Sequence, residues 1–399
     1  MEILFISHKY PPAIGGMEKH AFELRKRLES YFKVHPLIYD NQEGRLRFFF
    51  YLKKRVRSLL NAHPHIQLVY ANDGLLASQL AWLKKESTVK VIATVHGLDV
   101  VHPNTFYQQF IKKNLSQLDH LVAVSRATKT ACLRIGITPQ NISVIKNGVD
   151  QELAQTVCQP NFLKAFAEQR NLPLANKKIL VTMGRPVKRK GFSWFVKEVM
   201  PQLQDDIVLL MIGPRKNELP FFWQYVPASL QTQIELATGM ANDELALKES
   251  LQYPAIKDKV YEVGKLPFSE VLQLLAAADV FIMPNIQVAG DMEGFGLVAL
   301  EAALCGTPIL AANIEGIQDA VQDGQNGYLL PSKNKEAWVH RIQSLLADRV
   351  ALQQFGQQAR QFTLSNYSWE KMAAEYCSVF NASFGLRENE LADLIGTRI

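Results

Sequence analysis

Two carboxylates with a glycine turn between them form the stretch of this sequence best suited to chemistry. Glu293 precedes the turn Gly294-Phe295-Gly296, and Glu301 falls about one turn inside the helix expected to follow. Such a turn leaves backbone N–H groups unpaired at the start of the helix, where anions bind. One carboxylate could then meet a sugar hydroxyl and the other a ribose. The alternative is an amphipathic helix with an acidic cap and a solvated glutamate.

The same glycines also fit a dinucleotide-binding fingerprint, Gly294-x-Gly296-x-x-Ala299, with Glu315 further along the chain. That fingerprint requires the glycine turn to follow its strand directly. Here the preceding strand is expected to end near Met283, about ten residues too early, so we interpret the match as accidental.

A second candidate is the basic loop Gly184-Arg185-Pro186-Val187-Lys188-Arg189-Lys190-Gly191, which follows an expected strand. In α/β sheets, ligands bind beyond the carboxyl ends of the strands. Arg185, with its planar fork, and Lys190, with its point charge, suit a diphosphate. The loop is not a Walker P-loop, because no Ser or Thr follows the lysine. The alternative is a basic loop that is only solvated.

The first half of the chain offers two further candidates. Gly15 and Gly16 open a helix and could cradle an anion or a sugar, unless they serve only a tight turn. His96 and Asp99 stand at the end of another expected strand, where the histidine could line a ligand site instead of packing in the core.

No metal or other cofactor is expected. The sequence has no Asp-x-Asp motif and no His/Cys cluster with the spacing of metal ligands. The charge of a leaving diphosphate would then have to be met by Arg185, Lys190 and the helix N-terminus.

Alternating strand and helix patterns predict two doubly wound α/β domains with parallel sheets. The strands expected in the first half are Ile3–Ser7, Val34–Tyr39, Leu68–Ala71, Val91–Val95, Leu121–Val124 and Ser143–Ile145, with helices such as Glu18–Leu28 and Leu75–Lys84 between them. After a polar connector at 159–178, the expected strands are Ile179–Met183, Ile207–Ile212, Val260–Val263, Val280–Met283, Pro308–Ala311 and Gly327–Leu330. Only helices are expected from Trp338 onward. The ligand would occupy a cleft between the two sheets.

The composition is that of a globular protein. Of 399 residues, 48% are hydrophobic and 21% charged, no apolar run has the length of a membrane span, and the first residues resemble a strand and not a signal peptide. The four cysteines are scattered, which suits a reducing cytoplasm. The net charge of +6 divides into about +9 for residues 1–160 and about −3 for the rest, so the first half should face something negative.

Residues 45–60 form a basic, aromatic helix candidate. The stretch Arg45–Arg57 carries six cations around the aromatic run Phe48-Phe49-Phe50-Tyr51. At about 1 kcal/mol per basic residue near an anionic leaflet, such a helix could dock reversibly on a membrane. The alternative is a helix that buries its Phe and Leu side chains against the sheet. No nucleic-acid recognition motif accompanies these cations, so nucleic acid is not an expected partner.

Taken together, the chain resembles the retaining glycosyltransferases of the GT-B fold, specifically family four. The resemblance covers nearly the whole chain and rests on Gly15-Gly16-Met17-Glu18, His96-Gly97-x-Asp99, Val124-Ser125, Asn147-Gly148-Val149-Asp150, Gly184-Arg185 with Lys190-Gly191, and Glu293-x7-Glu301. The chain departs from the family pattern at Glu315-Gly316-Ile317-Gln318-Asp319, where many members have two glycines and then a glutamate.

The resemblance implies an acceptor-binding domain at 1–165, joined by a C-terminal helix at 369–399, and a donor-binding domain at 170–368. It implies that Arg185 and Lys190 hold the donor diphosphate, that Glu301 holds the ribose, and that Glu293 contacts the donor sugar. His96 would lie near the reacting carbon, so the candidate catalytic residues are His96, Glu293, Arg185 and Lys190. The other candidates are Gly294, Phe295, Gly296, Leu297 and Gly264 for the donor, and Gly15, Gly16, Asp99 and Asn147 for the acceptor side of the cleft.

The implied activity is transfer of a hexosyl group from a UDP-, GDP- or ADP-linked sugar to a hydroxyl of a glycan or lipid-linked glycan. The α configuration would be retained, and the leaving phosphate could itself accept the proton. The product would belong to cell-envelope polysaccharide or lipopolysaccharide. The expected place is the cytoplasm, at the inner face of the membrane if residues 45–60 dock there. Two alternatives stay open: a nucleotide-sugar isomerase of the same fold, and a non-catalytic nucleotide-sugar binding protein.

Overall fold

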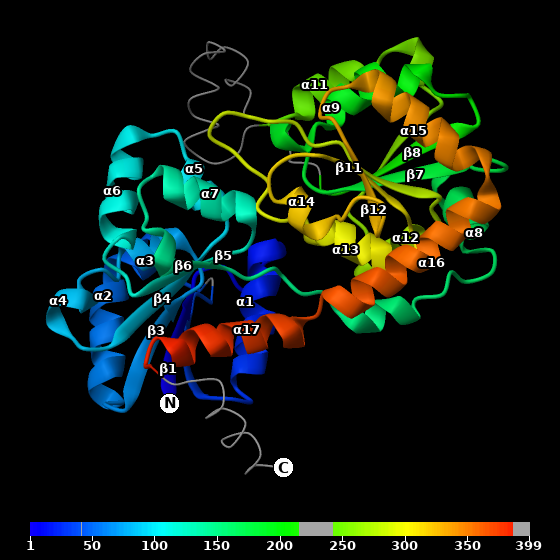
Figure 1. The fold of residues 1–399 in the computed structure, drawn as a ribbon. Coiled ribbons are helices and arrows are strands. Elements are labelled where there is room, and N and C mark those ends of the chain that lie inside the picture. Colours follow the sequence, from blue (N-terminus) through cyan, green and yellow to red (C-terminus); the bar gives the residue numbers. More distant parts are fainter. Residues whose placement is uncertain (41, 215–241, 386–399) are drawn as a thin grey trace. The chain divides into compact units, whose positions relative to one another are not determined.

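The computed structural model describes residues 1–40, 42–214 and 242–385. The chain divides into two compact units. Unit 1 consists of Met1–Gly148 and the segment that begins at Ser368, and unit 2 consists of Val149–Tyr367. Each unit is an α/β domain with one six-stranded sheet (Figure 1). The fold class predicted from the sequence is therefore confirmed.

Unit 1 contains a parallel sheet with the strand order β2-β1-β3-β4-β5-β6. Its strands are β1 (Glu2–Ser7), β2 (Lys33–Ile38), β3 (Ile66–Ala71), β4 (Lys90–Val95), β5 (His120–Ala123) and β6 (Ile142–Val144). Its helices are α1 (Gly16–Leu28), α2 (Arg45–Ala62), α3 (Gly74–Ser78), α4 (Leu83–Glu86), α5 (Leu98–Val101), α6 (Thr105–Leu115), α7 (Arg126–Arg134) and α17 (Trp369–Ala382). The central strands are almost continuously apolar and buried, as expected for parallel strands between helices.

The last helix of the described residues, α17, returns to unit 1 and lies beside α1 (Figure 1). Its side chains Trp369, Tyr376 and Phe380 are fully buried. Gly148 permits this approach, because a Cβ atom there would lie 2.3 Å from the backbone nitrogen of Trp369. The glycine of the Asn147-Gly148 motif therefore has a packing role, where the two segments of unit 1 meet.

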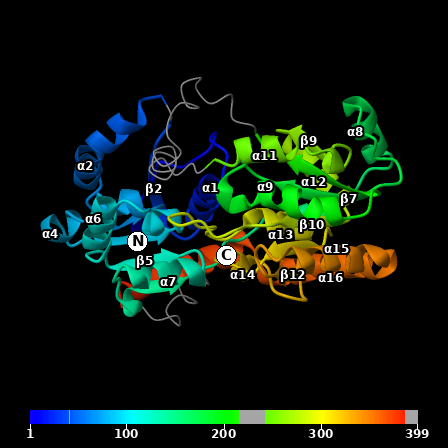
Figure 2. The same cartoon turned by 90° about the horizontal axis from the view of Figure 1, so that it is seen from above.

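Unit 2 contains a second parallel sheet, with the order β12-β11-β10-β7-β8-β9. Its strands are β7 (Lys178–Met183), β8 (Ile207–Ile212), β9 (Val260–Gly264), β10 (Val280–Met283), β11 (Ile309–Ala312) and β12 (Gly327–Leu330). Its helices are α8 (Phe162–Arg170), α9 (Phe192–Trp194), α11 (Glu244–Ser250), α12 (Phe268–Ala277), α13 (Leu297–Leu304), α14 (Ile317–Ala320), α15 (Lys335–Ala347) and α16 (Arg349–Asn366). Figure 2 shows α15 beside α16 and α9 beside α11.

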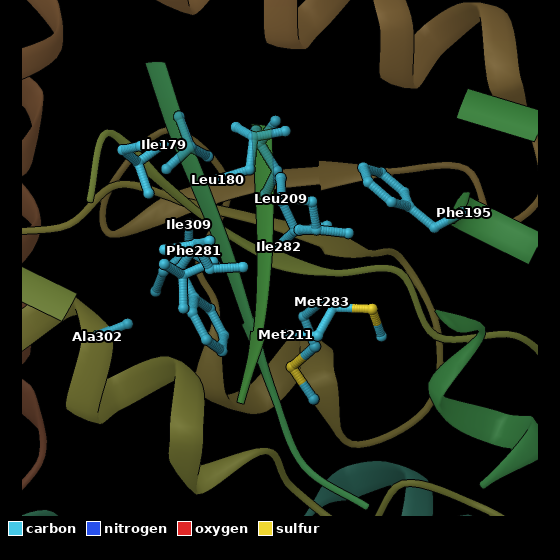
Figure 3. Packing of buried hydrophobic residues seen from close by; sticks show 14 of the residues in the cluster. Ile179, Leu180, Phe195, Leu209, Met211, Phe281, Ile282, Met283, Ala302 and Ile309 are labelled. Carbon is cyan, nitrogen blue, oxygen red and sulfur yellow. The ribbon is translucent and has the colours of Figure 1, made fainter. Parts of the chain in front are cut away.

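The core of unit 2 is formed by the faces of its sheet and the helices packed on them. Figure 3 shows Leu180, Phe281 and Ile282 of adjacent strands clustered with apolar side chains from helices. All three are buried, as are Phe195 and Trp338, whose rings make an edge contact at 5.7 Å. Burial of such side chains is the main favourable term for the unit.

Each sheet has one switch point, where strands are added in opposite directions. In unit 2 it lies between β7, which leads to β8 and β9, and β10, which leads to β11 and β12. In unit 1 it lies between β1 and β3. Loops that leave the carboxyl ends of the two strands diverge there, which opens room for a ligand.

The two units divide earlier in the chain than the boundary at 165–170 expected from the sequence. Helix α8 lies inside the polar connector at 159–178 and packs on α12, with an ion pair of 2.9 Å between Arg170 and Glu270. These contacts join the connector to unit 2. The expected C-terminal segment, 369–399, groups with unit 1 through residue 385, and 386–399 lie outside the described residues.

Every strand of the two sheets matches a run predicted from the sequence to within two residues at either end. The continuous helix predicted at Leu75–Lys84 is wrong, because α3 ends at Ser78 and α4 begins at Leu83. The hydroxyl of Ser78 donates to the carbonyl oxygen of Gly74 at 2.7 Å, a side-chain bond that favours the end of a helix.

Helix α2 buries one face of the basic aromatic segment, as the alternative to membrane docking required, and leaves apolar side chains exposed on another. Phe48, Leu52 and Val56 are buried at positions four residues apart, while Leu46 and Phe50 are exposed on the opposite side. No helix in the parts of the chain that the structure describes is both long and apolar enough to cross a bilayer.

Candidate functional site

The basic loop of unit 2 leaves the sheet at the switch point, after β7. It ends at Gly191, which has φ +67, and a Cβ atom there would lie 2.1 Å from the carbonyl oxygen of Pro284. Glycine is required for both the conformation and the close approach. Because Pro284 follows β10, the basic loop runs directly against the segment that leaves the neighbouring strand.

Lys190 and Glu293, which the sequence suggested separately, meet in the structure. Nζ of Lys190 lies 2.7 Å from Oε2 of Glu293, and the two side chains are 11% and 12% exposed. Asn285 donates from Nδ2 to the same oxygen at 3.1 Å and is itself buried. The sequence prediction missed Asn285, although its position just after β10 and Pro284 is a signal for a ligand-facing residue.

Arg189 is a second residue that the sequence prediction passed over. Its guanidinium lies 3.4 Å from Asp291 and 3.8 Å from Glu293, and it donates to the carbonyl oxygen of Met292 at 3.2 Å. Arg185, which the prediction preferred, is exposed at the start of the loop. The cations of the loop therefore differ in position, and Arg189 and Lys190 lie against the carboxylates of Asp291 and Glu293.

The site favours the charged form of Glu293 but not that of Lys190. Burial alone would raise the pKa of Glu293, but the charges of Lys190 and Arg189 outweigh it and lower the pKa to about 2. Burial lowers the pKa of Lys190, and the charges of Arg189 and Arg185 add to this, against the opposing effect of Glu293. The site thus stabilises its carboxylate but leaves the ammonium under-compensated. A bound anion would supply the missing negative charge.

The glycine turn after Glu293 opens α13, as predicted. Gly296 is the N-cap of α13 with φ +102, and no side chain of the described residues caps the helix there. The first N–H groups of α13 are therefore available to an anion. Phe295 is buried, and its ring centroid lies 6.4 Å from that of Tyr367. Its side chain therefore packs inside unit 2, and a ligand could contact only its backbone. Leu297, the first residue of α13, is half-buried.

Two other predicted donor residues lie further from the ion pair. Glu301 is in the middle of α13 and 7% exposed. Gly264 ends β9 with φ +75, and its carbonyl oxygen accepts a hydrogen bond of 3.0 Å from the N–H of Gly213. It shares the carboxyl edge of the sheet with Lys190, but β8 lies between their strands.

Glu315, noted from the sequence in the dinucleotide fingerprint and in a departure from a family pattern, is bonded to the backbone of Glu293. Its Oε2 accepts a hydrogen bond of 2.6 Å from the backbone N–H of Glu293. The N–H of Gly316 donates to the carbonyl oxygen of Glu293 at 3.1 Å. The segment after β11 is therefore bonded to both sides of the Glu293 backbone.

In unit 1 another polar group gathers at its own switch point. Nδ1 of His8, which follows β1, lies 2.9 Å from Oδ2 of Asp73, which follows β3, and neither was predicted. The predicted glycines lie in the loop between β1 and α1. Gly15 is extended and Gly16 begins α1. A Cβ atom at Gly15 would lie 2.3 Å from the carboxylate of Glu18, so the small residue leaves room for that side chain.

His96 and Asp99 are brought together as the sequence suggested, but mainly through the backbone. The carboxylate of Asp99 accepts hydrogen bonds from the N–H groups of His96, Gly97 and Gly74, at 3.2, 2.8 and 2.9 Å. Nε2 of the His96 ring lies 2.8 Å from the carbonyl oxygen of Asn72. Burial raises the pKa of Asp99, against the effect of His96. Asp99 thus fixes the turn that holds the His96 ring.

Asn147 serves a buried histidine and not an open surface. Its Oδ1 lies 2.8 Å from Nδ1 of His20, and the His20 ring meets that of His96 edge-on at 5.0 Å. Burial, with the charge of His96 adding to it, lowers the pKa of His20 to about 3, so this ring is neutral near pH 7. The predicted acceptor residue Asn147 therefore contacts His20, and the His20 ring in turn packs against that of His96.

Within residues 1–40, 42–214 and 242–385, no cluster of three or more His, Cys, Asp and Glu side chains could hold a metal ion. The strongest set of polar groups is the one at the switch point of unit 2. Its two partly buried cations and the open start of α13 suit an anion.

Two sequence families match this chain. The family described as "Glycosyltransferase Family 4" matches residues 14–153, and "Glycosyl transferases group 1" matches residues 164–362. The glycogen synthase of Mycobacterium tuberculosis is 36% identical over 434 residues, which cover 96% of this chain and 95% of the relative. The chain belongs to glycosyltransferase family 4.

This glycosyltransferase is also 35% identical over 322 residues to the D-inositol 3-phosphate glycosyltransferase of Corynebacterium urealyticum, covering 77% of the chain and 69% of the relative. Among solved structures, HepE of Anabaena in complex with UDP and glucose matches it with a TM-score of 0.72 and 19% identity, over 96% of this chain and 100% of HepE. That likeness shows the GT-B fold. The family and fold expected from the motifs are confirmed.

Proposed function

We propose that this glycosyltransferase binds a nucleotide-diphosphate sugar at the switch point of unit 2. The observation that carries the proposal is the contact of 2.7 Å between Lys190 and Glu293, which joins the basic loop to the turn before α13. Arg185 and Arg189 add positive charge, and the start of α13 adds backbone N–H groups. A diphosphate has the charge and the acceptor oxygens that this set of groups lacks.

In the proposed reaction, the bond between the anomeric carbon and the β-phosphate oxygen breaks, and its electron pair leaves with the nucleoside diphosphate. The acceptor hydroxyl forms the new bond from the same face, so the α configuration is retained. Its proton passes to the departing phosphate oxygen. Negative charge grows on the phosphate as the bond breaks, so fixed cations and N–H groups stabilise the transition state more than the substrate.

Individual residues have different support in this scheme. Lys190 and Arg185 would neutralise the phosphate, and Glu293 would orient a hydroxyl of the sugar, a role that its contact with Lys190 supports. The roles of Glu301 on the ribose and of His96 near the reacting carbon rest on the family resemblance. We propose that no metal is needed, because the basic loop already carries the opposing charge.

The first donor to test is a UDP-sugar, because HepE of Anabaena was solved with UDP and with UDP-glucose. GDP- and ADP-sugars are the alternatives. The assay measures nucleoside diphosphate released from each donor, with and without added acceptors. Sugar interconversion without release would favour the isomerase, and binding without turnover would favour the non-catalytic protein.

Arg185→Ala tests the assignment of the diphosphate site. Loss of one donor to a growing negative charge costs about 2–4 kcal/mol of barrier, so kcat should fall by roughly 30- to 1,000-fold. Lys164→Ala is the matched control, since this cation lies on α8 and its side chain is 75% exposed. Wild-type turnover in Arg185→Ala would refute the assignment.

We further propose that the acceptor is a lipid-linked glycan, reached at an anionic membrane surface through α2. Leu46 and Phe50 lie one turn apart on α2 and are 87% and 80% exposed. Four of the six cations of α2 form ion pairs with Glu43 or Glu86. The net charge of this surface is therefore near +4, which gives roughly 4 kcal/mol of attraction to an anionic leaflet. This supports reversible docking and is less than the six cations alone suggested.

The docking proposal is tested by sedimentation with vesicles at low salt. The protein should bind phosphatidylglycerol vesicles and not phosphatidylcholine vesicles, and Leu46→Ser/Phe50→Ser should lose most of the binding. Val350→Ser, on α16 and 65% exposed, is the control. Equal behaviour of the two variants would refute docking through α2. We propose that this membrane surface is the cytoplasmic one. The four cysteines are free thiols, which a reducing compartment allows.

A further inference from the structure

We propose that Glu315 is a proton-linked positioning residue of the donor site: its carboxyl holds the backbone of Glu293 and takes up a proton when a nucleoside diphosphate binds at the basic loop. The inference rests on the proposed function, because it requires a diphosphate beside Lys190. It deepens that function by making donor affinity depend on pH through one named carboxyl group.

Glu315 connects two loops that carry the site. It follows β11 with φ +51, and its Oε2 accepts the hydrogen bond of 2.6 Å from the N–H of Glu293. The neighbouring Gly316 packs so tightly that a Cβ atom there would lie 2.0 Å from the carbonyl oxygen of Gly294. The same Glu293 meets Lys190 at 2.7 Å. Glu315 and Gly316 therefore hold the backbone at Glu293 and Gly294, and the position of the Glu293 carboxylate beside Lys190 depends on them.

Three carboxylates share this small region, and they are compensated unequally. Asp291 has Arg189 at 3.4 Å, and Glu293 has Lys190 at 2.7 Å. Among the described residues, Glu315 has no cation within ion-pair distance. Burial raises the pKa of Glu315 to about 7; Glu293 and Asp291 repel its charge, while the N–H of Glu293 and the charge of Arg189 oppose the shift. Glu315 is therefore the carboxyl of the three that gains or loses its charge near neutral pH.

A diphosphate at the basic loop would add negative charge beside these carboxylates. Like charge disfavours the ionised form of Glu315, so the complex should hold its proton more tightly than the unliganded protein. A neutral carboxyl still has a carbonyl oxygen that can accept the N–H of Glu293. Protonation thus removes the repulsion and keeps the hydrogen bond. Because binding takes up a proton, affinity should fall as the pH rises above about 7.

The test is calorimetric titration of the full chain with UDP, GDP and ADP at pH 7.5, in two buffers with different ionisation enthalpies. The wild type should take up about half a proton more than Glu315→Gln on binding. Its Kd should weaken roughly fourfold between pH 7 and pH 8.5, and that of Glu315→Gln should change less. Glu315→Gly, which suits φ +51, should also lose the proton linkage. Glu336→Gln, an exposed carboxylate on α15, is the control.

Equal proton uptake in the wild type and Glu315→Gln would overturn the inference while leaving the proposed function intact. If the wild type binds none of the three nucleotides, the proposed function is overturned instead. A measurement without nucleotide separates the two cases. Because folding raises the pKa of Glu315 from 4.5 to about 7, its ionisation costs stability increasingly between these pH values, and the cost is complete above about pH 7. Glu315→Gln should therefore melt at a higher temperature than the wild type at pH 8.5, with a smaller difference at pH 5.5. A difference that does not change with pH would also overturn the inference.

Discussion

Lys190→Met removes the ammonium at the centre of the donor site and keeps a side chain of similar length. The ion pair with Glu293 is 2.7 Å long, and both side chains are nearly buried, so water screens it little. Burial raises the pKa of Glu293, but Lys190 and Arg189, with a hydrogen bond from Asn285, outweigh it and lower the pKa from 4.5 to about 2. A shift of that size corresponds to about 3 kcal/mol. Because Arg189 supplies part of it, we expect Lys190→Met to cost about 2 kcal/mol of unfolding free energy.

The measurement is a double-mutant cycle in urea, followed by tryptophan fluorescence and circular dichroism at pH 7. Glu293→Gln leaves Lys190 unpaired, whereas Lys190→Met/Glu293→Gln leaves neither charge behind. The double variant should therefore be more stable than the sum of the single effects predicts, by more than about 1 kcal/mol. Lys164→Met, at an exposed site on α8, should be close to the wild type.

The pH dependence provides a second check on the same pair. A carboxylate with a lowered pKa contributes stability that is complete above its ordinary pKa and is lost as the pH falls through the lowered one. The difference between the wild type and Lys190→Met should thus be constant above about pH 5 and shrink toward pH 2. Additive single effects, or a difference that stays constant down to pH 2, would refute the reasoning.

Three further predictions follow from the geometry. Gly191→Ala should lower the urea midpoint by a margin equivalent to about 2 kcal/mol or more, because a methyl group would lie 2.1 Å from the Pro284 oxygen at a residue with φ +67. Gly148→Ala should expose α17 to hydrogen exchange, because the new Cβ would lie 2.3 Å from the Trp369 nitrogen, and unchanged protection would contradict this. EDTA should leave turnover unchanged, and a loss of rate that Mg²⁺ restores would contradict the proposal that no metal is needed.

The strands could be predicted closely because each is a short apolar run buried in a parallel sheet. Runs such as Ile207–Ile212 and Val280–Met283 need little context to be recognised. The helix expected at 75–84 ends early beside a local bond, from the Ser78 hydroxyl to the carbonyl oxygen of Gly74, which hydrophobic periodicity does not contain. Helix α8, inside the expected connector, groups with unit 2 through its packing on α12, which its composition does not state.

The donor site was predicted in parts but not as an assembly. The basic loop and the acidic turn were each recognised from residue type, but their contact depends on β10 lying next to β7, which the order of strands in the chain does not state. Arg189, Asn285 and Glu315 were missed because their roles are geometric. Arg189 is of the same residue type as Arg185, so residue type could not distinguish them, and the path of the loop brings Arg189 and Lys190 to Asp291 and Glu293.

Unit 1 is made from two stretches of chain that synthesis separates by the whole of unit 2. On the ribosome, α17 emerges only after the whole of unit 2, so the earlier part of unit 1 has to remain without it in the meantime. The surface that α17 covers includes Tyr70, whose ring packs 5.8 Å from that of Phe380. A nascent chain therefore presents an apolar face until α17 arrives, and truncations before Ser368 should be targets for chaperones and proteases.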